Sequence, residues 1–421
     1  MPISNGNTLY VGGSGEGNYT TIQYAIDNAS DGDTVFVYDF SSPYYENVVI
    51  DRSINLIGED KENTIIDGNL IGSVIIVTTD WVNISGFTIQ NSGEGWDKAG
   101  IIIYESHTTI LGNTVSNNYN GIYLSSSSDN NISGNTVSYN KMSGIDIRCS
   151  SNNNFVIGNS AINNDDGIYL YESSNNNIIN NTVSNNYEGI YLYSSNNNII
   201  SYNTISNNDH YSIHLQTSSS NNIIGNTILD NYYGIRLISS SSNIVSGNTV
   251  SNNRTGIALT YSDSNDIIGN TVSNNVYGLY FGDSSDNNII GNTASNNNYG
   301  LSLSDYSQNN NVYHNNFIKN NLYNVYGEFE IFENTWDDGK YGNYWSDYEE
   351  RYPDAEKLPF KGIWDTPYTI YWDNVDHCPL IRQWTKSMSS DSITRPGATF
   401  NSLFNWLLEH SSILERFLNF I

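Results

Sequence analysis

Residues 287–303 read Asn-Asn-Ile-Ile-Gly-Asn-Thr-Ala-Ser-Asn-Asn-Asn-Tyr-Gly-Leu-Ser-Leu, and this stretch holds three short apolar pieces separated by Asn, Ser and Gly. Each piece is too short for a helix, and the alternation of apolar and polar residues predicts β-strands. The residues between the pieces predict turns, because Gly and Asn tolerate positive φ.

The end of this stretch, Gly300-Leu-Ser-Leu303, is one of ten copies of the same clause. In each copy a glycine, or once a serine, is followed by an aliphatic residue, a variable residue and another apolar one. The first residues of the copies are 21 to 23 positions apart: Gly100, Gly121, Gly144, Gly167, Gly189, Ser212, Gly234, Gly256, Gly278 and Gly300. A fixed period in the twenties is typical of a solenoid. Three strands and three turns in about 22 residues predict an all-β, right-handed parallel β-helix, with strands of successive coils about 4.8 Å apart.

A second motif of four residues recurs at the same period. It consists of Gly or Asn, then Asn, then Thr or Ser, then Val or Ile. Its asparagines are predicted to stack as a ladder whose amides bond to the coils above and below: Asn113, Asn135, Asn159, Asn181, Asn203, Asn226, Asn248, Asn270, Asn292 and Asn315. Inward aliphatic residues such as Ile190 and Leu192 are expected to form apolar stacks, each side chain contributing roughly 1.5–3 kcal/mol. The coils therefore share one continuous core.

Both ends of the array need covering. Residues 19–29 have the apolar spacing of a short helix with Thr20 or Thr21 as N-cap, and we expect this helix to precede the first strand and cover the open end. Residues 327–386 are rich in Trp and Tyr, which predicts a C-terminal cap or a sugar-stacking surface, and we favour the cap.

The predicted domain organisation is a β-helix with its N-terminal cap over residues 1–326, regular from 100 to 326, followed by the aromatic-rich cap over 327–386. Residues 387–399 form a Ser/Thr/Gly/Pro-rich linker. Residues 400–421 predict an amphipathic helix that docks on the solenoid, self-associates or lies on a membrane. Its charged residues, such as Glu409 and Arg416, argue against a transmembrane segment.

The composition restricts the partners. The 421 residues include 16 Lys and Arg against 44 Asp and Glu, a net charge of −28. Such a charge disfavours nucleic acid and anionic membranes and suits neutral or cationic ligands. Cys149 and Cys378 are too few for a disulfide framework. The sequence shows no signal peptide, and we interpret it as the mature segment of a secreted or cell-surface protein.

Several motifs resemble known families. Residues 19–29, Gly32-Asp-Thr-Val35 and Ile54-Asn-Leu-Ile-Gly58 resemble the opening of pectin-lyase-like β-helix proteins. The Asn-Asn-Ile-Ile-x-Gly-Asn-Thr repeats resemble the carbohydrate-binding and sugar-hydrolysis (CASH) repeats of the NosD family, and the likeness extends through Gly342–Tyr348 and Asp376–Ile381. The resemblance implies a surface β-helix that binds glycan or serves a structural role. A carbohydrate-processing enzyme, of glycoside hydrolase or polysaccharide lyase type, is the alternative.

The NosD resemblance also raises a copper-binding accessory role. Copper sites need convergent His, Cys or Met. The histidines are scattered, and only His210 and His214 share a coil, with no Met or Cys beside them. The sequence therefore gives little support for copper.

The variable positions of the glycine clause are expected to point outward in columns. Tyr169, Tyr171, Tyr191 and Tyr193 then form a two-by-two patch on adjacent coils, which indicates sugar stacking or simply the strand propensity of Tyr. Polar side chains flank this patch and are candidate ligand-binding residues of a glycan groove: Arg148 beside Asp146 on one side, and His214 and Arg236 on the other.

Three acidic residues are catalytic candidates: Asp146, and the pair Asp166 and Glu188, which occupy the same phase in adjacent coils just before the glycines. Carboxylates one coil apart repel, so one pKa should rise, and glycosidases use such pairs. A solvated turn is the interpretation that we favour for the pair. No cofactor is expected except calcium, for which Asp337, Asp338 and Asp347 are candidate ligands without EF-hand spacing.

Overall fold

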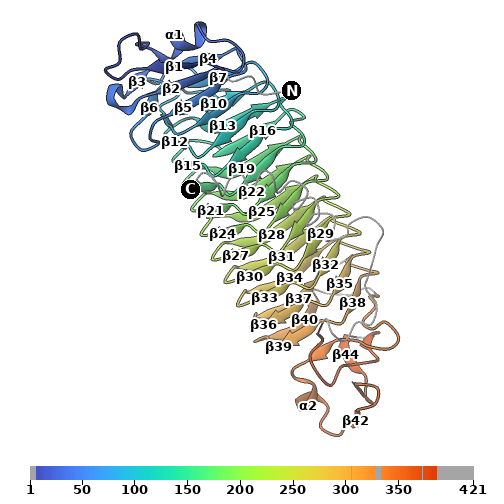
Figure 1. Ribbon diagram of the computed structural model, residues 1–421. Helices are drawn as coiled ribbons and strands as arrows, with labels where there is room; N and C mark the ends of the chain where they lie inside the picture. Colours follow the sequence, from blue (N-terminus) through green and yellow to red (C-terminus); the bar gives the residue numbers. More distant parts are fainter. Residues whose placement is uncertain (1–5, 305, 328–332, 372, 386–421) are drawn as a thin grey trace. The chain divides into compact units, whose positions relative to one another are not determined.

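The computed structural model describes residues 6–304, 306–327, 333–371 and 373–385. Within it the chain winds as a right-handed parallel β-helix of about 14 coils (Figure 1). The all-β solenoid with three strands in each coil of about 22 residues is thereby confirmed. The predicted linker at 387–399 and the predicted helix at 400–421 lie outside the described residues, and the division into domains stays a prediction. None of the described helices is long and apolar enough to span a membrane.

Three parallel sheets run along the helix, and each is named here after its first strand. The β1 sheet has 14 strands: β1 (Thr8–Val11), β2 (Thr34–Val37), β5 (Asn55–Gly58), β8 (Asn83–Ser85), β11 (Thr109–Leu111), β14 (Asn131–Ser133), β17 (Phe155–Ile157), β20 (Asn177–Ile179), β23 (Ile199–Ser201), β26 (Asn222–Ile224), β29 (Ile244–Ser246), β32 (Asp266–Ile268), β35 (Asn288–Ile290) and β38 (Asn311–Tyr313).

The β3 sheet also has 14 strands: β3 (Tyr44–Tyr45), β6 (Ile65–Asp67), β9 (Thr88–Gln90), β12 (Thr114–Ser116), β15 (Thr136–Ser138), β18 (Ser160–Ile162), β21 (Thr182–Ser184), β24 (Thr204–Ser206), β27 (Thr227–Leu229), β30 (Thr249–Ser251), β33 (Thr271–Ser273), β36 (Thr293–Ser295), β39 (Asn316–Ile318) and β41 (Tyr344–Trp345).

The β4 sheet has 13 strands and contains all ten glycine clauses: β4 (Val48–Ile50), β7 (Ile75–Val77), β10 (Ala99–Ile103), β13 (Asn120–Ser125), β16 (Ile145–Arg148), β19 (Asp166–Tyr171), β22 (Glu188–Tyr193), β25 (Tyr211–Gln216), β28 (Tyr233–Ile238), β31 (Thr255–Thr260), β34 (Tyr277–Gly282), β37 (Tyr299–Leu303) and β40 (Tyr323–Gly327).

Each coil buries one aliphatic residue from its β1-sheet strand, one from its β3-sheet strand and two from its β4-sheet strand. In one central coil these are Ile200, Ile205, Ile213 and Leu215, all fully buried. Each stacks on the equivalent residue of the neighbouring coils, as Ile200 does between Ile178 and Ile223. The predicted apolar stacks are therefore present and form one core.

The predicted asparagine ladder is also present. Asn203 donates its Nδ2 to Oδ1 of Asn226 in the next coil at 3.0 Å, and its own Oδ1 accepts from Asn181 in the previous coil at 3.0 Å. It is 1% exposed. A second donated bond, to the carbonyl of Ile178 at 2.9 Å, ties the side chain to strand β20 of the preceding coil. The ladder thus supplies partners for backbone groups at a buried turn.

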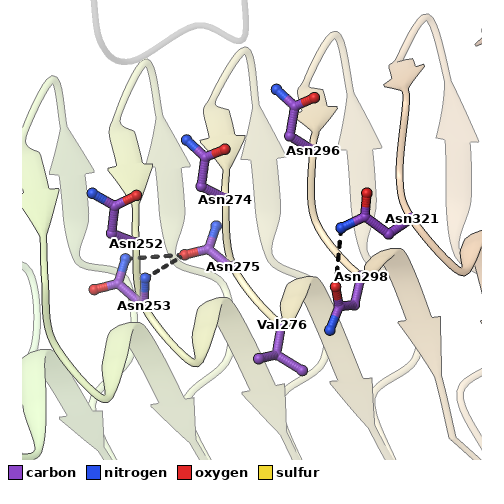
Figure 2. A pocket seen from close by; sticks show the side chains of 8 residues that line it. All are labelled: Asn252, Asn253, Asn274, Asn275, Val276, Asn296, Asn298 and Asn321. Carbon is purple, nitrogen blue, oxygen red and sulfur yellow. Dashed lines mark hydrogen bonds between the residues drawn. The ribbon is translucent and has the colours of Figure 1, made fainter.

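Two further asparagine ladders, not predicted from the sequence, occupy the other two turns. One follows the β3-sheet strands, and Figure 2 shows its link between Asn253 and Asn275: Asn118, Asn140, Asn164, Asn186, Asn208, Asn231, Asn253, Asn275, Asn297 and Asn320. The other precedes the β1-sheet strands: Asn130, Asn154, Asn176, Asn198, Asn221, Asn243, Asn265, Asn287, Asn310 and Asn334.

The glycines of the repeated clause have a different role from the one that turn chemistry suggests. They lie in or beside the β4-sheet strands rather than at turns. A Cβ on Gly121 would lie 2.4 Å from the carbonyl oxygen of Gly144 in the next coil and 2.4 Å from Cγ1 of Val137. Close approach of neighbouring coils therefore favours glycine at this position, and Ser212 is the exception among the ten copies.

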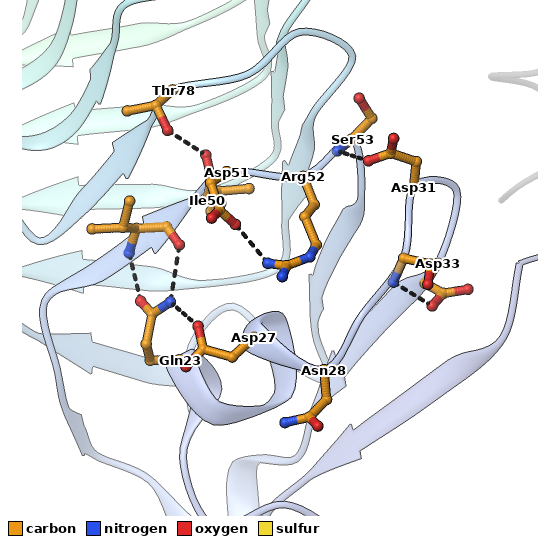
Figure 3. Close-up of polar contacts among 12 residues, drawn as sticks. Gln23, Asp27, Asn28, Asp31, Asp33, Ile50, Asp51, Arg52, Ser53 and Thr78 are labelled. Atoms are coloured by element: carbon orange, nitrogen blue, oxygen red, sulfur yellow. Dashed lines mark hydrogen bonds and ion pairs between the residues drawn. The ribbon is translucent and has the colours of Figure 1, made fainter.

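The N-terminal cap contains α1 (Ile22–Asp27), which begins after Thr21, whose hydroxyl accepts a hydrogen bond from the backbone of Tyr24. The prediction of a capping helix with this N-cap is confirmed, but β1 precedes the helix, so the expected order was wrong. The side chain of Gln23, which is labelled in Figure 3, bonds both backbone groups of Val49, with Oε1 accepting at 2.7 Å and Nε2 donating at 3.2 Å. The edge strand β4 thus gains a side-chain partner in place of a strand. A 3₁₀ turn, η1 (Asp39–Ser41), follows β2.

The C-terminal cap buries its aromatic residues on the last coil. Trp345 stacks between Phe317 and Tyr368, with ring centroids 4.7 and 4.1 Å apart, and Trp336 is 1% exposed. The capping role that we favoured for these residues agrees with this packing. The cap also contains α2 (Tyr348–Arg351) and the short antiparallel pairs β42 (Lys357–Leu358) with β43 (Ile363–Trp364), and β44 (Tyr368–Tyr371) with β45 (Asn374–Asp376).

Candidate functional site

The outer face of the β4 sheet carries the residues singled out from the sequence. Asp146, Tyr169, Tyr191, His214 and Arg236 are consecutive partners in the parallel register, one in each coil. A second column two residues further along each strand runs from Arg148 through Tyr171 and Tyr193. The predicted alignment of these residues in rows is thus found in the structure.

The four tyrosines form a contiguous aromatic patch. Tyr171 and Tyr193 stack almost parallel, with centroids 5.5 Å apart and an interplanar angle of 4°. Tyr169 and Tyr191 lie 5.1 Å apart. The Tyr191 hydroxyl donates to Oε1 of Gln216 at 2.9 Å, so the patch has both ring faces and polar edges.

Asp146 is fully buried, although its position on the strand points away from the core. The larger side chains of Tyr123 and Tyr169 occupy the neighbouring positions in its column. Arg148 donates its Nε to Oδ1 of Asp146 at 2.7 Å and lies over the Tyr169 ring at 4.9 Å. Burial raises the pKa of Asp146 to about 6, and the Arg148 guanidinium opposes this rise. The expectation of an exposed Asp146 was therefore wrong, because neighbours in adjacent coils cover it.

Asp166 and Glu188 are direct partners in the register of β19 and β22. The solvated turn that we favoured for this pair is wrong, because both residues begin strands and Glu188 is only 9% exposed. Burial, together with the nearby Glu188 carboxylate, raises the pKa of Asp166 to about 8. The expectation that one pKa of the pair rises agrees with this result.

Two histidines of the next coil contact Glu188. Nδ1 of His214 lies 3.1 Å from its Oε2, and Nδ1 of His210 lies 3.9 Å from its Oε1. Since a carboxylate only accepts hydrogen bonds, Nδ1 of His214 carries the proton in this contact. His214 stacks on Tyr191 with centroids 4.5 Å apart, and the Arg236 guanidinium lies 4.6 Å from the Tyr233 ring. The structure therefore brings Glu188 and His214 together, a contact that the sequence did not predict.

A third outward column, not predicted from the sequence, lies just before the glycines. Beyond Glu188 it contains Tyr211, Tyr233, Tyr277, Tyr299 and Tyr323. Tyr277 and Tyr299 stack with centroids 4.9 Å apart. Tyrosine repeated at this phase was visible in the sequence, but the position was interpreted as a turn.

The raised pKa of Asp166 predicts a pH dependence of stability. The folded protein retains this proton up to pH about 8, whereas an unfolded Asp loses it near pH 4. The contribution of Asp166 to stability is therefore most favourable below pH 4 and declines as the pH rises toward 8. We expect Asp166→Asn to gain stability relative to the wild type between pH 5 and pH 9, on the order of a few kcal/mol.

Urea unfolding at several pH values measures this gain, and Asp209→Asn, at an exposed site, is the control. Identical pH profiles for Asp166→Asn and the wild type would contradict the assignment.

The three candidate calcium ligands lie in the C-terminal cap, outside the β4 sheet. Asp337 accepts a hydrogen bond from the backbone of His377, Oδ2 of Asp338 lies 3.1 Å from Nε2 of His314, and Asp347 accepts from the Tyr368 hydroxyl. Within the described residues no group of three or more His, Cys, Asp and Glu is placed to hold a metal ion. Calcium binding by these aspartates stays a prediction.

The comparisons with known proteins identify one sequence family. A family model described as "Periplasmic copper-binding protein (NosD)" matches residues 26–233 and 207–350. A search of curated proteins gave no significant match.

Solved structures share the fold at low sequence identity. The Dettilon tailspike protein is 16% identical with a TM-score of 0.56, covering 76% of this chain and 68% of its own. The A-module of the Azotobacter vinelandii mannuronan C-5 epimerase AlgE4 is 17% identical with a TM-score of 0.51, covering 75% and 94%. The catalytic domain of a GH87 α-1,3-glucanase in complex with nigerose is 13% identical with a TM-score of 0.51, covering 82% and 70%.

The family description names copper, which would need a set of converging ligands among the described side chains. His210 and His214 are the nearest approach to a ligand pair, and the third group beside them is Glu188. Copper favours His, Cys and Met ligands that converge, but no such set of three is found in the described ranges. These residues do not fit a copper site.

Proposed function

The chain belongs to the NosD family of parallel β-helix proteins, and from that premise we propose that it binds glycan chains on the outer face of the β4 sheet. The observation that supports this most is the stacked tyrosine patch formed by Tyr169, Tyr171, Tyr191 and Tyr193. The C–H faces of a sugar ring pack on aromatic rings, while its hydroxyls need donors and acceptors around the ring. Arg148, His214 and Arg236 offer such groups at the two ends of the patch.

The neighbours in fold and the overall charge support a carbohydrate ligand. The epimerase and the glucanase are described as acting on mannuronan and α-1,3-glucan, and each shares the coiled architecture with this chain. A net charge of −28 favours neutral glycans over anionic ones and over nucleic acid. We propose a location at the cell surface or outside the cell, and the family description, periplasmic, likewise names a compartment outside the cytoplasm.

Removing the stacked pair Tyr171 and Tyr193 from the patch tests the proposal. The double variant Tyr171→Ala/Tyr193→Ala is expected to lose at least about tenfold in affinity, because buried tyrosines are frequent hot spots in binding interfaces. A glycan array of neutral glucans and uronates identifies ligands, and calorimetry on the best one gives the affinity. Tyr261→Ala is the control, since Tyr261 is 63% exposed at a turn.

An array without hits would favour a purely structural role for the β-helix. Retention of full affinity in the double variant would place the binding surface elsewhere. Tyr261→Ala is expected to bind as tightly as the wild type.

A further inference from the structure

Unpaired buried polar atoms are concentrated beside Glu188. Of the nine buried side-chain nitrogens and oxygens without a hydrogen-bond partner in the described residues, four belong to the adjacent coils of β25 and β28: Nδ1 of His210, Oγ of Ser212, Nε2 of His214 and Nε of Arg236. His214 is 5% exposed. A buried polar group without a partner costs free energy. Such groups therefore indicate a site whose hydrogen bonds are completed by a ligand.

Asp166 and Glu188 have different surroundings although they are neighbours in the register. The Glu188 carboxylate is held by His214 at 3.1 Å. The Asp166 carboxyl group accepts no hydrogen bond from the residues that the structure describes, and burial together with the Glu188 carboxylate raises its pKa to about 8. Two carboxyl groups whose environments separate them in this way suit an acid and a base in one reaction.

The spacing of the two residues also suits a glycosidic bond. The backbones of adjacent parallel strands lie about 4.8 Å apart, so the carboxyl groups of two in-register residues can approach to a similar distance. Retaining glycosidases place their two carboxyl groups about 5–5.5 Å apart. The tyrosine patch begins on the same two strands, because Tyr169 and Tyr191 follow Asp166 and Glu188 by three residues. A glycan held on the patch therefore passes the two carboxyl groups.

We propose that Asp166 and Glu188 hydrolyse a glycosidic bond of the glycan bound on this face, with Asp166 as proton donor and Glu188 as nucleophile. This inference rests on the proposed glycan binding and adds catalysis to it. In the first step Oε1 of Glu188 bonds to the anomeric carbon, the bond from that carbon to the leaving oxygen breaks, and Asp166 gives its proton to that oxygen. In the second step water gives a proton to the Asp166 carboxylate and bonds to the anomeric carbon, which releases Glu188. One water is consumed, and the anomeric configuration is retained.

His214 acts as a positioning residue. Its Nδ1–H holds Oε2 of Glu188 and leaves Oε1 to attack, since the other nearby nitrogen, Nδ1 of His210, is 3.9 Å from Oε1. Replacing His214 with Gln is expected to lower kcat with little change in KM, because the attacking carboxylate is no longer held in position. A raised KM with an unchanged kcat would contradict this role.

The test uses the full chain with borohydride-reduced dextran, laminarin, nigeran and polymannuronate, so that every new reducing end comes from cleavage. Wild-type protein is expected to release oligosaccharides with new reducing ends from at least one polymer. Asp166→Asn and Glu188→Gln are expected to lower that rate by on the order of 10²–10⁴-fold while keeping the calorimetric affinity for the same polymer. Asp209→Asn is the matched control and is expected to keep the wild-type rate.

The outcomes separate catalysis from binding. Binding of a polymer without new reducing ends would overturn the hydrolytic inference and leave glycan binding in place, whereas no binding to any polymer would count against both. Unsaturated ends, the products of elimination, would also overturn hydrolysis.

Because Glu188→Gln could fail through misfolding, Glu188→Gly is assayed with added azide, and formation of a glycosyl azide would support Glu188 as the nucleophile. No azide adduct from a folded Glu188→Gly protein would exclude that role.

Discussion

Replacing Asn203 with leucine is expected to lower the free energy of unfolding by about 3–6 kcal/mol. The leucine removes the Oδ1 acceptor of two donors on Asn181, its backbone N–H and its Nδ2, and the donor to the carbonyl of Ile178. All three groups lie in the interior, where each unsatisfied one costs about 1–3 kcal/mol. Urea or thermal unfolding of the purified variant measures the loss.

A matched control lies four residues away in the same coil. Asn207 is exposed and has a φ of 54°, which glycine adopts without strain. Asn207→Gly is expected to change stability by no more than about 0.5 kcal/mol. If Asn203→Leu were equally mild, the ladder would contribute no net stability and the apolar stacks would hold the coils together alone.

The second large effect is expected at the C-terminal end. Trp345 is 1% exposed, stacks on Phe317 and Tyr368, and donates its Nε1 to Oδ2 of Asp376 at 2.8 Å. Trp345→Ala is expected to cost about 3–5 kcal/mol from the cavity. The loss of the indole donor adds to this cost, because burial already raises the pKa of Asp376 to about 7. Unfolding experiments give the magnitude of the loss.

Hydrogen exchange locates the effect of Trp345→Ala. The amides of β38, β39 and β40 are expected to exchange faster in the variant than those of β19 and β22, because coils contact only their neighbours. Trp96→Ala, at a site 68% exposed, is the control and should leave both stability and exchange unchanged. Uniformly faster exchange along the whole array would mean that the coils unfold as a single cooperative unit.

The coil could be predicted because residues of the same type recur at the same position of each repeat. Ile122, Ile145 and Ile168 stand at fixed intervals in the sequence and become stacked partners in the β4 sheet. The Asn203 ladder was found in the same way, since its members recur at one phase and most of them follow a glycine. One period therefore fixed both the strand register and the row of tyrosines.

The two other ladders were missed because asparagine is so frequent in the turns. Asn207 and Asn208 are adjacent and look alike in the sequence, yet the first is exposed with positive φ and the second is 2% exposed and bonds to Asn231. Backbone conformation separates them, and residue type alone does not report it. The spacing of 22 to 24 residues between members of these ladders was available as a signal.

The positions of the site residues could be predicted from the sequence, but the surroundings of their side chains could not. The period placed Tyr169 beside Tyr191 and Asp166 beside Glu188. It did not show that Tyr123 and Tyr169 cover Asp146, or that His214 reaches back one coil to Glu188. Those facts depend on side-chain volume and rotamer, which a periodic pattern does not encode.

All three asparagine ladders advance by one member per coil and point the same way, each Nδ2 donating to the coil that follows, as from Asn203 to Asn226. Each coil therefore presents amide acceptors to the coil before it and amide donors to the coil after it. Duplicating or deleting one whole coil between Asn203 and Asn226 keeps every ladder amide paired and changes the length of the β-helix by about 4.8 Å. Insertions of other sizes interrupt all three amide chains at once, so natural length variation in such molecules is expected to come in whole turns.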